Sequence, residues 1–135
     1  MNRALDDNLL VCGQISPADV ARFASEGVTM IVNNRPDHED PDQPQGSEIE
    51  EAAAHAGVAY RHVPILRGIG PGDVEAMKDA LEEAGDGKTL AFCRSGTRSA
   101  MVCALAQREM GVEREEVEQR LARAGFDPGP IQHLL

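Results

Sequence analysis

The twenty residues KTLAFCRSGTRSAMVCALAQ (88–107) place a predicted strand, a tight loop and a predicted helix in direct succession. The first six residues, KTLAFC, form a short apolar run that is typical of a buried strand. The segment SAMVCALAQREMG, 99–111, is mostly apolar and typical of a helix that ends in polar residues. A strand that turns sharply into a helix is a unit of the parallel α/β folds, so this stretch predicts that class.

Strands and helices alternate through the rest of the chain. Ser16 and Pro17 predict the start of one helix, and Ser47 with Glu50 predicts a capping box for the next. This order predicts a single α/β domain over residues 1–135, with a mainly parallel central sheet and helices on both faces. The predicted strands are 9–12, 28–34, 58–65 and 88–93, and the predicted helical stretches are 16–27, 47–57, 70–85, 99–111 and 113–125. After them we expect a turn at 127–130 and a short tail.

The composition excludes several function classes. The net charge of −10 over 135 residues argues against nucleic acid or an anionic membrane as a partner. No apolar run approaches the ~18 residues of a membrane-spanning helix, and Met1–Leu10 does not resemble a signal peptide. Three cysteines without a CxxC spacing do not predict a disulfide framework or a zinc site. We therefore expect a cytoplasmic protein with reduced thiols, no metal and no cofactor.

The loop after the predicted strand 88–93 has the features of an anion cradle around a nucleophile. Cys93 stands at the end of this strand, where parallel sheets bind their ligands, and Gly96 with the small Ser95 allows a sharp turn. Backbone N–H groups and the helix N-terminus converge there, and Arg94 and Arg98 add positive charge. All of these favour a thiolate, so we predict a lowered pKa and a nucleophilic Cys93 rather than an inert buried thiol.

The segment CRSGTRS (93–99) resembles the active-site loops of two enzyme families. Cysteine phosphatases, tyrosine-specific and dual-specificity, have C-x-x-G-x-x-R, usually with a histidine before the cysteine. Rhodanese-like sulfurtransferases have the shorter C-R-x-G-x-R. Gly96 fits both patterns, but the arginine is Arg98, and Ser99 and Phe92 stand where a phosphatase has its arginine and its histidine. The shorter loop implies a smaller cradle, which suits the terminal sulfur of a persulfide better than a phosphoryl group.

A wider resemblance rests on VTMIVNNRPDHEDPDQP (28–44), GVAYRHVPI (57–65) and TLAFCRSGTRSA (89–100). Together they resemble a bacterial family, the phosphatase-like domain of beta-lactamase-hydrolase-like proteins, which is also described as a family of sulfur transferases. The resemblance implies a fold like that of the dual-specificity phosphatases. Such domains can be fused to persulfide dioxygenases of the metallo-hydrolase type, so we expect a functional link to a persulfide dioxygenase, although no such second domain is predicted in this chain.

A phosphatase would also need a general acid for its leaving group. The loop after 58–65 offers Asp73, whose position favours a helix cap over catalysis. The long acidic loop RPDHEDPDQPQG (35–46) offers Asp37 and Glu39, and it could equally be a solvated surface loop. Sulfur transfer has no such requirement, because sulfite and thiolates leave readily.

The remaining candidates outside the loop are an arginine, two cysteines and the histidines. Arg35 is either a substrate-binding cation or a partner for the neighbouring acids. Cys12 and Cys103 are predicted to pack in the core rather than to resolve an intermediate. The histidines are predicted to be structural or at the surface: His55, His62 and His133.

These observations predict a sulfurtransferase that moves sulfur from thiosulfate or a low-molecular-weight persulfide to a thiol acceptor through a Cys93 persulfide. The alternatives are a cysteine phosphatase that acts through a phosphocysteine, and a non-catalytic module that binds anions or senses redox state. The predicted catalytic residues are Cys93 and Arg98. The predicted substrate-binding residues are Arg35, Arg94, Ser95, Gly96, Thr97 and Ser99.

Overall fold

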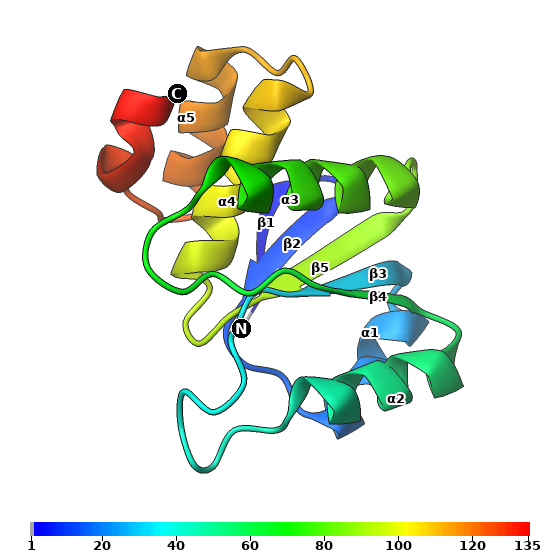
Figure 1. The fold of residues 1–135 in the computed structure, drawn as a ribbon. Coiled ribbons are helices and arrows are strands. Elements are labelled where there is room, and N and C mark those ends of the chain that lie inside the picture. Colours follow the sequence, from blue (N-terminus) through cyan, green and yellow to red (C-terminus); the bar gives the residue numbers. More distant parts are fainter. Residues whose placement is uncertain (1) are drawn as a thin grey trace.

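The computed structural model describes residues 2–135, which are arranged around one five-stranded sheet (Figure 1). The strands are β1 (Arg3–Asp6), β2 (Leu9–Cys12), β3 (Val28–Asn33), β4 (Ala59–His62) and β5 (Lys88–Phe92). Their order across the sheet is β1-β2-β5-β3-β4. β1 is antiparallel to β2, while β2–β5, β5–β3 and β3–β4 are parallel. The predicted mainly parallel sheet is therefore confirmed.

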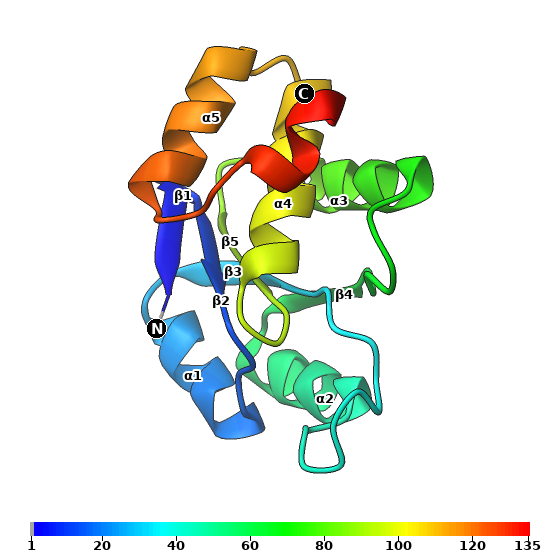
Figure 2. The same ribbon diagram turned by 90° about the vertical axis from the view of Figure 1, so that its left-hand side faces the viewer.

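Helices cover both faces of this sheet, as predicted (Figure 2). One face carries α1 (Pro17–Ser25) and α2 (Gly46–Ala56), which enclose a core with Phe92 and Ile31. The other face carries α3 (Pro71–Ala84), α4 (Thr97–Glu109), α5 (Arg114–Arg123) and the 3₁₀ helix η1 (Gly129–Leu134), around a second and larger core. Within residues 2–135 no helix is long and apolar enough to cross a membrane.

Three chain segments meet at the carboxyl ends of the central strands. Phe92 pairs with Cys12 on one side and with Asn33 on the other. Beyond it, the Cys93 N–H donates to the Cys12 carbonyl at 3.3 Å, and the Asn34 N–H donates to the Phe92 carbonyl at 2.8 Å. This register brings the Cys93 loop, the segment after β2 and the start of the acidic loop to one edge of the sheet.

The strand β1 was not predicted. It begins and ends with a charged residue and lacks the apolar run by which the other strands were recognised. In the structure it forms a hairpin with β2, and the Asp6 carboxylate holds the turn by accepting the Asn8 N–H at 2.7 Å. Asp and Asn are typical turn residues, so the sequence Asp6-Asp7-Asn8 was the available signal for this hairpin.

Helix starts and the chain end also differ from the prediction. The predicted capping box of Ser47 with Glu50 is wrong, because α2 begins at Gly46 and the Gln45 N–H donates to the Glu48 carboxylate at 2.8 Å. α4 begins two residues earlier than predicted, at Thr97, because the preceding loop is tight enough to lead directly into the first helical turn. The predicted short tail forms η1, whose Ile131 is buried.

Candidate active site

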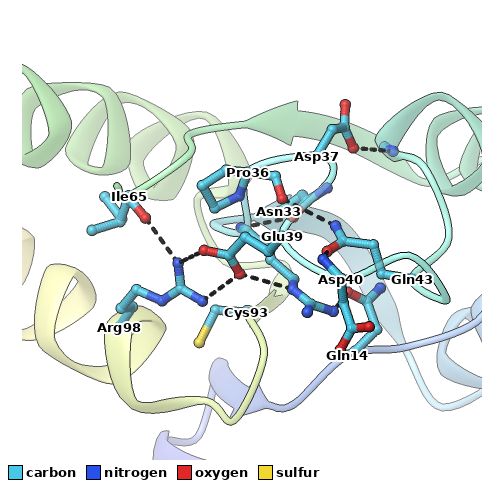
Figure 3. A network of polar contacts seen from close by, with 12 residues as sticks. Gln14, Asn33, Pro36, Asp37, Glu39, Asp40, Gln43, Ile65, Cys93 and Arg98 are labelled. Carbon is cyan, nitrogen blue, oxygen red and sulfur yellow. Dashed lines mark hydrogen bonds and ion pairs between the residues drawn. The ribbon is translucent and has the colours of Figure 1, made fainter. Parts of the chain in front are cut away.

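Cys93 lies directly after β5, with no exposed surface. Its Sγ accepts a hydrogen bond from the Gly96 N–H at 3.1 Å. The first turn of α4 follows at once, so further backbone N–H groups point to the same place. The predicted loop amides thus begin to enclose the sulfur at Gly96, and Figure 3 shows Cys93 beside Arg98 and Glu39.

Two opposing effects set the pKa of Cys93. Burial raises it, but hydrogen bonds from the backbone N–H groups of Ser99, Ser95 and Gly96, together with the Ser99 hydroxyl, outweigh burial and lower the pKa below that of an ordinary thiol. The Ser99 hydroxyl is buried and has no hydrogen-bond partner with full geometry among residues 2–135, the Cys93 sulfur included, so it lowers the pKa of Cys93 less than the backbone N–H groups do. The site therefore stabilises a thiolate at Cys93.

Glycine is required at two points where the chain segments approach each other. Gly96 has φ of 97°, a left-handed conformation, and a Cβ on it would lie 3.3 Å from the Cys12 carbonyl carbon. A Cβ on Gly13 would lie 2.9 Å from the Arg94 carbonyl oxygen. Both glycines let the end of β2 pack directly against the Cys93 loop.

Arg98 is bound to an acidic partner. Its two terminal nitrogens donate to the two Glu39 carboxylate oxygens, at 2.7 and 2.8 Å, in a bidentate arrangement. One of these nitrogens also donates to the Ile65 carbonyl at 2.9 Å. The hydrogen bond with Glu39 makes the largest contribution to the raised pKa of Arg98, and the charge of Cys93 makes a smaller one. The guanidinium, the carboxylate and the sulfur therefore form one cluster (Figure 3).

Arg35 belongs to the same cluster and is only 4% exposed. Its Nε donates to Glu39 at 2.9 Å, and a terminal nitrogen donates to the Gln14 side chain at 3.0 Å. Its backbone N–H donates to the Asn33 side chain at 2.9 Å. Of the two predicted roles for Arg35, this structure shows the partner of an acid, and its contact with a substrate stays a prediction.

The other predicted loop residues contribute through the backbone. Arg94, Ser95 and Thr97 are exposed, and the Ser95 hydroxyl donates to the Thr97 hydroxyl at 3.4 Å. The Arg94 carbonyl accepts the Gln14 N–H at 3.3 Å, which ties the loop to the end of β2. Their predicted contact with a substrate stays a prediction.

Each of the three acids considered as a general acid is already engaged. The Asp73 carboxylate accepts the Gly70 N–H at 2.8 Å at the start of α3, in agreement with the predicted cap. The Asp37 carboxylate accepts the Gly46 N–H at 2.7 Å at the start of α2. The hydrogen bonds from Arg98 and, to a smaller extent, from Arg35 lower the pKa of the Glu39 carboxyl to about 2.

The other two cysteines lie in the cores. Cys12 packs with Phe92 on the face of α1 and α2, and burial raises its pKa to about 12. Cys103 lies within α4 in the larger core, where burial raises its pKa far above that of Cys93. The His62 Nε2–H donates a hydrogen bond to the Arg35 carbonyl at 3.0 Å, a structural contact. Among residues 2–135 no group of three His, Cys, Asp or Glu side chains is placed to hold a metal.

The sequence did not identify the Glu39 contact with Arg98 or the Gln14 contact with Arg35. Glu39 and Arg98 are 59 positions apart, and Gln14 and Arg35 are 21 apart. The signal was indirect, since all four residues follow strands whose carboxyl ends lie at the same edge of a parallel sheet.

A cysteine at the end of the central strand, with its loop leading into a buried helix, defines the fold class of the cysteine phosphatases. The structure of PTPMT1 has this fold, with a TM-score of 0.74 and 16% identity over 99% of this chain and 91% of that one. A protein of Neisseria meningitidis Z2491, described as a "putative phosphatase", is more similar, with a TM-score of 0.78 and 29% identity over 98% of this chain and 94% of that one.

The family is shown by the match of residues 2–110 to the beta-lactamase hydrolase-like protein, phosphatase-like domain. The chain belongs to this family. A beta-lactamase hydrolase-like protein of Xylella fastidiosa is 38% identical over 128 residues, which are 93% of this chain but 29% of that protein. The chain thus spans less than a third of the length of this relative. These descriptions support the phosphatase alternative better than the predicted sulfurtransferase.

Proposed function

We propose that the protein is a sulfurtransferase that carries sulfur as a persulfide on Cys93. The observation that carries this proposal is the engagement of all three acids that could protonate a leaving group. Asp73 and Asp37 each bind the N–H of a helix start, and Glu39 is held ionised between two arginines. A phosphate ester needs such a proton donor, whereas sulfite and thiolates depart without one.

The chemistry follows from the thiolate. Cys93 attacks the outer sulfur of thiosulfate or of a low-molecular-weight persulfide. The sulfur–sulfur bond of the donor breaks, its electron pair leaves with sulfite or with a thiolate, and Cys93 keeps the outer sulfur. The thiolate of an acceptor, such as glutathione, then attacks that sulfur and releases Cys93 as a thiolate. The amides of residues 95–99 stabilise the negative charge, and one oriented donor of this kind contributes about 3–4 kcal/mol.

The second candidate is a cysteine phosphatase that acts through a phosphocysteine. It is favoured by the family and by the phosphatase descriptions of the structural neighbours. The loop geometry is less favourable to it. The buried Ser99 stands where the phosphatase pattern has its arginine, and Arg98 comes one position earlier.

Intact-mass measurement separates the candidates. The protein is incubated with thiosulfate and, separately, with an alkyl persulfide, and we expect a gain of one sulfur atom that is absent in Cys93→Ser. Cys12→Ala is the matched control, because it removes a buried thiol of the other core and should still load. No sulfur gain, together with vanadate-sensitive hydrolysis of an aryl phosphate, would establish the phosphatase instead. If neither sulfur loading nor aryl phosphate hydrolysis is found, but Cys93 is a thiolate, the result would favour the non-catalytic module.

A further inference from the structure

The Glu39 carboxylate takes the donors with which the site would hold a substrate oxyanion. It accepts both terminal nitrogens of Arg98, at 2.7 and 2.8 Å, and the Nε of Arg35 at 2.9 Å. A guanidinium presents its N–H groups to phosphate, sulfate and carboxylate in the same forked geometry. The Glu39 carboxylate therefore occupies the two arginines as a substrate anion would, although it belongs to the same chain (Figure 3).

The acidic loop is built to hold Glu39 in this place. His38, the residue before it, has φ of 67°, and among residues 2–135 it is the non-glycine residue in the left-handed region. The Gln43 side chain crosses the loop, since its amide nitrogen donates to the Pro36 carbonyl and its oxygen accepts the Asp40 N–H, both at 3.0 Å. A strained residue held by such contacts fixes the direction of its neighbour.

Charge and burial then determine what can enter. Two guanidiniums, of Arg35 and Arg98, face the single carboxylate of Glu39, and the Cys93 sulfur, when it is ionised, balances the remaining positive charge of the cluster. Cys93 has no exposed surface beneath this cluster. A dianion that needs Arg98 has to displace Glu39, which is tethered in the same chain and competes at a high effective concentration.

We propose that Glu39 is a specificity-determining residue that closes the Cys93 cradle to oxyanions. The proposal rests on the proposed function, in which Cys93 is the nucleophile, and it names the substrate class. Dianions such as thiosulfate and phosphate esters are disfavoured. Alkyl persulfides without a carboxylate, whose single charge is on the persulfide sulfur and which need the loop amides rather than Arg98, are favoured.

The first test uses inorganic phosphate as the probe and requires no turnover. Iodoacetamide labels Cys93, and phosphate bound in the cradle protects it. Glu39→Gln keeps the size of the side chain but removes its charge, so half-protection should occur at about tenfold lower phosphate than in the wild type. Asp42→Asn is the matched control, because it removes one charge from an exposed position of the same loop.

The outcomes of this test are decisive. A shift in Glu39→Gln that is absent in Asp42→Asn supports the proposal, and Glu39→Ala should show the same shift if the Gln variant is unstable. Equal protection of wild type and variant, protection of neither, or an equal shift in Asp42→Asn overturns it, since the last result would be an effect of net charge alone.

The second test measures specificity. The rate of sulfur loading on Cys93 is compared for thiosulfate and for an alkyl persulfide that has no carboxylate, in wild type and Glu39→Gln. We expect the ratio of the thiosulfate rate to the persulfide rate to rise about tenfold in the variant. An unchanged ratio contradicts the role of Glu39. Loading by neither donor would instead refute the proposed function, and the phosphate test would still decide whether Glu39 excludes oxyanions.

Discussion

The backbone N–H of Gly96 donates a hydrogen bond to the Cys93 sulfur at 3.1 Å. The backbone N–H groups of Ser99 and Ser95 also lower the pKa of Cys93, and the Ser99 hydroxyl makes the smallest contribution among these donors. Although burial opposes ionisation, these donors together keep the pKa of Cys93 below that of an ordinary thiol. The loop therefore acts on the sulfur largely through main-chain groups, which most substitutions leave in place.

The first prediction concerns the one side chain in this set. Ser99→Ala removes the hydroxyl but keeps the N–H, so the pKa of Cys93 should rise towards the ordinary thiol value. Alkylation by iodoacetamide needs the thiolate, so its rate increases with pH, and the midpoint of that increase should move to higher pH in Ser99→Ala. The measurement is the pH dependence of the labelling rate.

Ser95→Ala is the control for this shift. The Ser95 hydroxyl is exposed and bonds to Thr97, while its N–H is the group that lowers the pKa of Cys93. The midpoint in Ser95→Ala should stay at the wild-type value. A midpoint that does not move in Ser99→Ala would show that the backbone alone sets the pKa.

The second prediction separates the two reasons for a glycine at position 96. Gly96 and Gly111 both have φ of 97°, but a Cβ on Gly111 meets nothing within 4 Å, whereas a Cβ on Gly96 meets the backbone of Cys12. Each Gly→Ala substitution should cost about 1–2 kcal/mol of unfolding free energy for its left-handed conformation. Gly96→Ala should cost more than Gly111→Ala in denaturant unfolding, and it alone should raise the pKa of Cys93. Equal losses of unfolding free energy in the two variants would mean that the close packing of Gly96 against the end of β2 does not contribute to stability.

The third prediction concerns the conformation that directs Glu39. His38 has a positive φ, so His38→Val, which puts a β-branched residue there, should lower the unfolding free energy by about 1–2 kcal/mol. His55→Val is the matched substitution at an exposed position of α2 and should change stability by only a few tenths, about 0.5 kcal/mol at most. His38→Asn should be tolerated, since Asn adopts this region readily. Equal losses in the two Val variants would argue against strain at His38.

Much of this architecture could be predicted from the sequence because the relevant signals are local. Apolar runs marked β2, β3 and β5, and the spacing from Cys93 to Arg98 marked the anion loop before any contact was known. The capping role of Asp73 was equally local, since the carboxylate and the Gly70 N–H that it binds lie three positions apart.

The parts that were missed depend on the tertiary fold. β1 has little apolar character of its own and is a strand because β2 offers it a partner. The bridge from Glu39 to Arg98 joins residues 59 positions apart, and no spacing rule identifies which of the acids in loop 35–46 reaches the arginine. The left-handed conformation of His38, which directs Glu39 toward Arg98, is known only from the backbone angles of the structure.

The last prediction tests Asp73, the acid that follows β4 in the sequence. If Asp73 is a cap, its role is to accept the Gly70 N–H at 2.8 Å, and a neutral acceptor can replace it. Asp73→Ala should then cost about 1 kcal/mol of unfolding free energy, while Asp73→Asn keeps most of the stability. Both variants should load sulfur on Cys93 at the wild-type rate.

A general acid would behave in the opposite way, because Asn accepts a hydrogen bond but has no acidic proton to give. Asp73→Asn would then abolish aryl phosphate hydrolysis at unchanged stability, and its pH–rate profile would lose the limb that reports the acid. Glu75→Ala, at an exposed acid of the same helix, controls for the loss of a charge near the start of α3. Stability and rate measured together on these variants therefore separate a cap from a catalytic acid, and with it the sulfurtransferase from the phosphatase.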